Sequence, residues 1–215
     1  MSATSLPTST LNAWLMKPWA KPLLWLLCAV PLVALCAAAA TDQLGANPVD
    51  KFIKEMGEWA LRFLWLTLAI TPLRDIAGLP GLIRHRRALG VTAFVYAFIH
   101  FLAYAWLDQG WVLDDIVADV IKRNFILVGF VALLLMLPLA LTSFNAAIKA
   151  LGGRRWQVLH KLVYAVALLG LLHFYMKKAA KNDLAEVGVY AAILAVLLGW
   201  RVVRKGGVLA ALRVR

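Results

Sequence analysis

The feature that most constrains this chain is a series of long apolar segments without a charged residue. Residues 23–40, 88–107 and 124–148 contain no Asp, Glu, Lys or Arg, and residues 162–176 and 187–200 form two shorter segments of the same kind. About 20 apolar helical residues cross the hydrocarbon core of a bilayer. Only 16% of the 215 residues are charged, against roughly 25% in soluble domains. The sequence therefore predicts an all-α integral membrane protein.

A sixth segment reaches spanning length only if it includes two charged residues, Glu58 and Arg62. They lie four residues apart with the acid first, the helical spacing at which such a pair forms, and Thr71-Pro72 is predicted to close this helix. We therefore expect a six-helix transmembrane domain over residues 22–203, preceded by a cytoplasmic tail (1–21) and followed by a basic cytoplasmic tail (204–215). The predicted helices are residues 22–40, 54–72, 88–107, 124–143, 156–176 and 184–203.

The distribution of Lys and Arg predicts the orientation of the bundle. With a cytoplasmic N-terminus, fifteen of the 23 Lys and Arg residues fall in inner segments and seven in outer ones. Inner loops of membrane proteins carry an excess of Lys and Arg, so we expect both termini to be cytoplasmic. The net charge of +12 is then an orientation signal, and we expect a lipid bilayer and no nucleic acid as partner. Lys177, Lys178 and Lys181 lie outside, against this trend.

The outer segment between the third and fourth predicted helices also has a recognisable pattern. Its apolar positions, Val112, Ile116, Val117 and Val120, have the spacing of a short amphipathic surface helix. Four aspartates accompany them, so this segment is a candidate docking surface for a partner on the outer side. They are Asp108, Asp114, Asp115 and Asp119. An ordinary solvated loop would carry the same residues.

Histidines inside the predicted spans are the candidate functional residues. Polar side chains at membrane depth are costly and usually mark a path for ions, protons, electrons or a cofactor. At a rise of about 1.5 Å per residue, His100 lies ~18 Å and His173 ~25 Å from the cytoplasmic face, and His160 only ~6 Å. Helix ends vary by a few residues, so His100 and His173 can share a level. His85 is interpreted as a solvated or headgroup-level loop residue.

Two neutral imidazoles on facing helices are a ligand set for haem iron, and each nitrogen then lies about 2 Å from the metal. We therefore predict that His100 and His173 bind haem b, with Tyr104 one helical turn beyond His100. His160 lies thirteen residues before His173, about 220° around a continuous helix. Its role stays open between a ligand of a second haem, a propionate partner and part of a quinone or flavin site. A second haem would need a partner at the base of the third helix, where the sequence offers Arg86 and His85 and no obvious ligand.

Four segments resemble the MsrQ family, formerly called YedZ. This family is the haem-binding membrane subunit of the bacterial periplasmic methionine-sulfoxide reductase system, within a wider ferric-reductase-like transmembrane group. The resemblance covers about residues 59–175. The segments are ITPLR (70–74), RRALG (86–90), FVYAFIHFLAYAWLDQG (94–110) and RRWQVLHKLVY (154–164).

The resemblance implies a ferric-reductase-like fold in the bacterial inner membrane. It implies electron transfer from the quinone pool or a cytoplasmic flavin reductase, through haem b, to the periplasmic molybdopterin enzyme MsrP, which repairs oxidised proteins. The family's haem ligands correspond to His100, His160 and His173, with one haem or two, and FMN is implied without a motif that places it. Ferric-reductase relatives commonly space the two histidines of a helix fourteen residues apart, whereas this chain has thirteen.

Two other function classes stay open. The first is a proton- or ion-conducting bundle that depends on His100, although Glu58, the candidate deep acid, is neutralised by Arg62. The second is a structural anchor for a periplasmic enzyme, in which the histidines only hydrogen-bond to neighbouring helices. The chain contains no nucleophile–base pair or metal-hydrolase motif, so we expect an electron-transfer subunit more than a self-contained enzyme.

Overall fold

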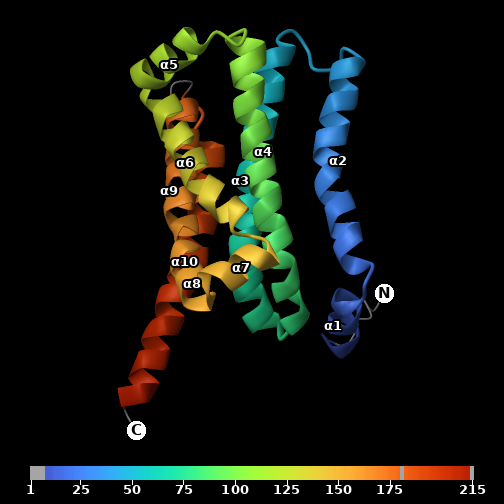
Figure 1. Ribbon diagram of the computed structural model, residues 1–215, viewed down its shortest axis with the longest axis vertical. Helices are drawn as coiled ribbons and strands as arrows, with labels where there is room; N and C mark the ends of the chain where they lie inside the picture. The colour runs from blue at the N-terminus through green and yellow to red at the C-terminus, as the bar shows by residue number, and fades with distance from the viewer. Residues whose placement is uncertain (1–7, 180–181, 214–215) are drawn as a thin grey trace.

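The computed structural model describes residues 8–179 and 182–213, and the regular secondary structure of these residues is entirely helical. The long helices stand side by side, and α5 lies across their upper end (Figure 1). The long helices are α2 (Ala20–Ala40), α3 (Pro48–Ala77), α4 (Arg86–Ala103), α6 (Asn124–Leu141), α9 (Leu162–Ala179) and α10 (Ala185–Arg213). The short elements are α1 (Thr8–Met16), the 3₁₀ helix η1 (Pro80–His85), the π-helix η2 (Tyr104–Asp108), α5 (Leu113–Lys122), α7 (Asn145–Leu151) and α8 (Gly153–Leu159).

Five segments of the described chain are long and apolar enough to cross a bilayer, and they match five of the six predicted spans. They are Ala20–Ala40, Pro80–Asp108, Asn124–Leu141, Gly153–Ala179 and Ala185–Arg204. The predicted surface helix is also confirmed as α5, which begins with Asp114 and Asp115 in its first turn.

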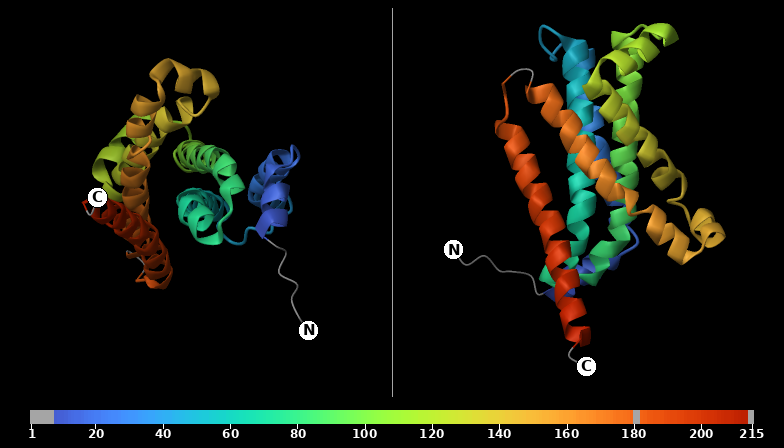
Figure 2. Two further views of the ribbon diagram at one scale, coloured as in Figure 1. Left: turned by 90° about the horizontal axis from the view of Figure 1, so that it is seen from below. Right: turned by 90° about the vertical axis from the view of Figure 1, so that its left-hand side faces the viewer.

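Helix α3 occupies the centre of the bundle, although charged residues interrupt its apolar sequence. It packs most extensively against α4 and also contacts α2, α9 and α10. Seen from below, α3 and α4 lie between α2 on one side and the pair α9 and α10 on the other (Figure 2). The buried side chains of α3 include Phe63, Leu64 and Trp65, so this helix supplies much of the core.

The predicted end of the second helix at Thr71-Pro72 is wrong, because α3 continues to Ala77. Proline has no N–H to donate to the carbonyl four residues earlier, here that of Leu68. The guanidinium of Arg201 on α10 donates to this oxygen instead. The helix ends at Gly78, which takes the left-handed conformation (φ 64°) and donates its N–H to the Arg74 carbonyl.

The predicted helix over residues 156–176 is also interrupted. The chain forms α8 and α9 with a break at His160 and Lys161, so the angular relation expected between His160 and His173 on one continuous helix does not apply. The break turns α8 away from the axis of α9 at the lower end of the bundle (Figure 1).

His85 is buried, at 5% exposure, and not the solvated loop residue expected. The reason is α1, which packs on η1. His85 Nε2 lies 3.1 Å from the Leu15 carbonyl oxygen, and the Gly81 N–H donates to Asn12 Oδ1 at 2.7 Å. Helix α1 therefore covers the segment between α3 and α4.

Tyr96 attaches α2 to the bundle by hydrogen bonds. The Tyr96 hydroxyl on α4 donates to the Cys28 carbonyl at 2.7 Å and accepts from the Leu32 N–H at 3.0 Å. Cys28 and Leu32 are four residues apart and would otherwise bond to each other within α2. The hydroxyl is therefore inserted into the hydrogen-bond ladder of α2, next to Pro31.

Candidate functional site

His100 on α4 and His173 on α9 face each other. Their ring centroids are 6.1 Å apart and the ring planes are inclined at 78°. Two imidazoles that share one metal, each about 2 Å from it, have centroids roughly 6 Å apart. The spacing therefore fits a single metal ion between the two rings.

A backbone carbonyl from another helix orients each ring. His100 Nδ1 lies 2.7 Å from the Ile53 carbonyl oxygen on α3, and His173 Nδ1 lies 2.6 Å from that of Phe125 on α6. A carbonyl oxygen only accepts, so each Nδ1 carries the proton and each Nε2 keeps its lone pair. Histidines that bind metals commonly donate their other N–H in this way.

Two glycines make room for the rings. A Cβ added to Gly57 on α3 would lie 3.1 Å from both Nδ1 and Cε1 of His100. A Cβ added to Gly129 on α6 would lie 2.7 Å from Nδ1 and 2.9 Å from Cε1 of His173. Each imidazole therefore lies directly on the backbone of the helix whose carbonyl it contacts.

The two histidines line a cavity of about 390 Å³, here called the outer cavity. Its walls include apolar residues such as Phe101, Ala132 and Gly170, together with charged side chains such as Arg123 and Lys178. The described residues contain no group of three or more His, Cys, Asp or Glu that could hold a metal ion. A facing pair of imidazoles suits a metal whose other ligands come from a cofactor, as in haem.

Tyr104 also lines the outer cavity, but its hydroxyl faces another element. It donates to Asp119 Oδ2 on α5 at 2.7 Å, and Asp119 Oδ1 accepts from Arg123 Nε at 2.6 Å. Tyr104 thus contributes a ring to the wall, and its hydroxyl ties the π-helical end of α4 to α5.

His160 and Arg86 lie elsewhere, in a second cavity of about 820 Å³ here called the inner cavity. His160 Nε2 lies 3.1 Å from Thr142 Oγ1, and its ring stacks on that of Trp156 with centroids 4.0 Å apart. None of the described lining residues is acidic, whereas five are basic: Arg86, Arg87, Lys161, Arg201 and Arg204. The inner cavity is therefore suited to an anionic ligand.

The two cavities follow one another along the bundle and share part of their walls. Leu64, Met136 and Val166 line both of them, and all three are buried. The structure thus brings two of the predicted histidines together in the outer cavity. The third, His160, lies with Arg86 on the other side of these three apolar side chains, here called the apolar partition.

The sequence prediction missed the partners that position the histidines. The Ile53 and Phe125 carbonyls are backbone groups, which no side-chain pattern reveals. The glycines Gly57 and Gly129 do carry a signal, because glycine inside an apolar helix often marks a close approach of another group.

Comparison with known proteins identifies the family. Residues 56–171 match the family described as "Ferric reductase like transmembrane component". Three similar proteins carry the name "Protein-methionine-sulfoxide reductase heme-binding subunit MsrQ". That of Polaromonas naphthalenivorans is 56% identical over 189 residues, which covers 88% of this chain and 86% of the relative.

The relative from Ralstonia nicotianae is 49% identical, covering 86% of this chain and 88% of its own length. That from Azospira oryzae is 51% identical, covering 86% and 79% respectively. No solved structure matches the chain. The identity and coverage show that this chain belongs to the MsrQ family of ferric-reductase-like transmembrane proteins.

Proposed function

We propose that the chain is a cytochrome b-type electron-transfer subunit of a methionine-sulfoxide reductase system, in which His100 and His173 bind haem b. The observation that carries this proposal is the histidine pair, with its 6.1 Å spacing and its two Nδ1 atoms held by carbonyls. The relatives are named haem-binding subunits, which supports the same assignment. Bound haem supplies reversible one-electron reduction of its iron.

The residues around the pair act on that chemistry through position and environment. The Ile53 and Phe125 carbonyls hold the rings and increase the basicity of each Nε2. The apolar walls exclude water, and burial is one of the factors that set the reduction potential of haem. The protein thereby fixes where an electron resides and how readily it leaves.

The proposal includes six spans with both termini in the cytoplasm of a bacterium and the bundle in its inner membrane. The sixth span is α3, whose charges are partnered. Arg62 Nη2 lies 2.7 Å from Glu58 Oε2, and its Nε donates to the Tyr190 hydroxyl on α10 at 2.9 Å. Residues 1–21 and 204–215 are then the cytoplasmic tails of a membrane domain at 22–203.

The inner cavity is the proposed point of electron uptake, from the quinone pool or a cytoplasmic flavin reductase. Arg204 pairs with Asp75, and the other four cations suit a phosphate-bearing flavin such as FMN. His160 is the one imidazole among the described lining residues, so a second haem would find a single histidine ligand there. The stacked Trp156–His160 pair offers an aromatic surface to a planar ligand, beside Arg86.

The outer end is the proposed point of electron release to a periplasmic molybdopterin enzyme, MsrP. The acidic surface of α5 and the preceding turn, with Asp108, Asp114 and Asp115, is its candidate docking surface. Reduction of methionine sulfoxide to methionine and water in that enzyme consumes the electrons together with protons. The chain itself would thus carry electrons and leave the chemistry on substrate to its partner.

The test is a reduced-minus-oxidised visible spectrum of the purified full-length chain, with the haem-to-protein ratio from the pyridine haemochrome. Wild type is compared with His100→Ala, His173→Ala and, as the matched control, His160→Ala. We expect the wild type to show a b-type spectrum and the first two variants to lose it. The third variant should keep the spectrum of the haem bound by His100 and His173.

A colourless wild type, produced with ample haem, would overturn the proposal. The alternative is then a histidine-dependent proton- or ion-conducting bundle, for which transport assays on His100→Ala are the direct measurement.

A further inference from the structure

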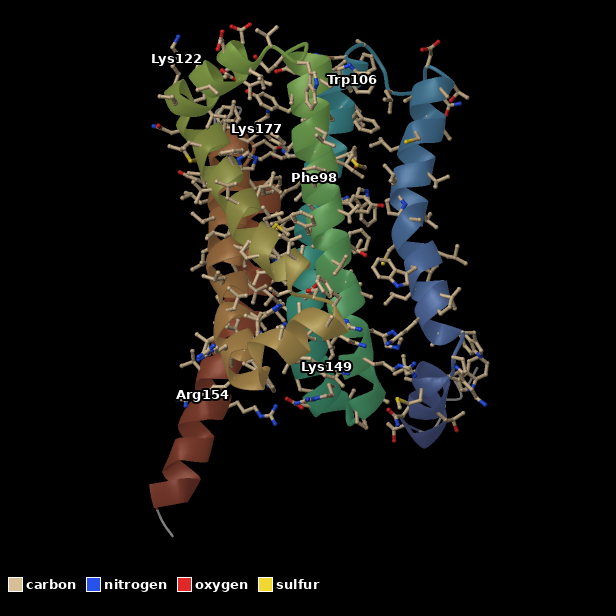
Figure 3. All side chains as sticks on the ribbon, viewed as in Figure 1. Phe98, Trp106, Lys122, Lys149, Arg154 and Lys177 are labelled. Atoms are coloured by element: carbon tan, nitrogen blue, oxygen red, sulfur yellow. The ribbon has the colours of Figure 1, made fainter. Side chains whose placement is uncertain are left out.

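Lysines on the outer side of the bundle depart from the usual bias of membrane proteins, in which Lys and Arg concentrate on the inner side. Lys177 is the clearest case. It lies at the upper end of the bundle with Lys122, opposite Lys149 and Arg154 (Figure 3). The orientation bias therefore does not explain Lys177, and its position in the structure indicates a different role.

Lys177 lies at the mouth of the outer cavity and lines it. It follows His173 by four residues on α9, so the two side chains share a helix face. Its Nζ lies 5.5 Å from the centroid of the Phe125 ring, and Phe125 provides the carbonyl that holds His173. The lysine therefore stands one helical turn above a candidate ligand, on the outer side.

The other cations at this mouth are engaged with carboxylates of the protein. Lys54 pairs with Asp50, and Arg123 pairs with Asp119 at 2.6 Å. Lys178 lies 2.7 Å from Glu186. For Lys177 the carboxylate contact is with Asp50 at 4.0 Å, a long distance to an acid that already pairs with Lys54. The ammonium of Lys177 is thus the cation that is best able to receive an acidic ligand.

We infer that Lys177 binds a carboxylate of the planar metal cofactor held by His100 and His173. This inference rests on the proposed function, because haem carries two propionate carboxylates. Lys177 is a positioning residue that anchors the cofactor at its outer edge. A nearby cation also favours the reduced iron, which carries one positive charge fewer than the oxidised iron.

The first test uses the full-length chain with its haem, comparing Lys177→Gln with Lys177→Arg and with Lys122→Gln as the matched control. Lys122 is an outer lysine that does not line the cavity. We expect Lys177→Gln to lower the haem midpoint potential and to release haem to apomyoglobin about tenfold faster, as loss of a hydrogen bond to a charged group implies. Lys177→Arg restores both, and Lys122→Gln behaves as wild type.

The second test separates a direct carboxylate contact from a general effect on the fold. The same chains are reconstituted with the dimethyl ester of haem, whose propionates carry no charge. The difference in haem release between wild type and Lys177→Gln should then disappear, whereas a difference in midpoint potential remains, because the charge of Lys177 acts on the iron with either haem. A difference in haem release that persists with the ester would overturn the inference.

The outcomes for the two proposals are distinct. Lys177→Gln that binds haem with the potential and release rate of Lys122→Gln refutes the role of Lys177 and leaves the histidine site intact. A wild-type chain without haem refutes the proposed function itself.

Discussion

Gly129 offers a direct test of how closely the fold positions His173. An alanine Cβ at this position would lie 2.7 Å from His173 Nδ1, and ordinary contact begins at 3.4 Å. The ring must therefore move by about 3.4 − 2.7 = 0.7 Å. At Gly57 the corresponding distance to His100 is 3.1 Å, so the required shift is about 3.4 − 3.1 = 0.3 Å. Gly188 on α10 has nothing within 4 Å of an added Cβ.

These shifts are large on the scale of a metal bond. A metal–nitrogen distance tolerates about 0.2 Å, and His173 is also held by its 2.6 Å contact with the Phe125 carbonyl. Overpacking costs about 1–3 kcal/mol, which lowers haem affinity roughly 5- to 150-fold. We expect Gly129→Ala to lose low-spin haem, Gly57→Ala to keep part of it, and Gly188→Ala to keep all of it.

The assay is the visible and EPR spectrum of each purified variant, with its haem-to-protein ratio. EPR distinguishes low-spin iron with two imidazoles from high-spin iron with one. The loss of bound low-spin haem should increase in the order Gly188→Ala, Gly57→Ala, Gly129→Ala. If Gly129→Ala binds haem with the spectrum and ratio of Gly188→Ala, the reasoning from glycine contact is wrong.

Two further substitutions probe the supports around the cavities. Tyr96→Phe removes the hydroxyl inserted into α2 and should destabilise the fold by about 1 kcal/mol, because the freed Cys28 carbonyl and Leu32 N–H can bond to each other. Buried Cys28 should then react faster with a thiol reagent, while exposed Cys36 is unchanged. Equal Cys28 rates in the variant and the wild type would contradict this. Thr142→Val removes the hydroxyl 3.1 Å from His160 and should lower the free energy of unfolding by about 1 kcal/mol. The spectrum of the haem in the outer cavity should stay the same. An altered spectrum would mean that the two cavities are not separate.

The sequence supported the parts of the fold that depend on local composition. Long apolar segments predicted the five bilayer-length helices, because such a segment has few other stable environments. The period of apolar residues likewise predicted α5. Helical rise alone allowed His100 and His173 to share a level, and the structure places their rings in contact range.

The parts that the sequence did not predict depend on distant partners. Helix α3 passes through Pro72 because Arg201, far along the chain, satisfies the freed Leu68 carbonyl. His85 is buried because α1 folds back over η1. His160 lies at a helix break, where no proline or left-handed glycine signals one in advance.

The apolar partition formed by Leu64, Met136 and Val166 has a consequence for energy coupling. In the proposed function, an electron crosses this partition from the inner to the outer cavity and moves through part of the membrane's electric field. A full crossing changes the energy of one charge by about 2.3 kcal/mol per 100 mV. With the cytoplasm negative, outward movement of an electron is favourable, so an energised membrane would drive reducing power toward the periplasm and oppose its return.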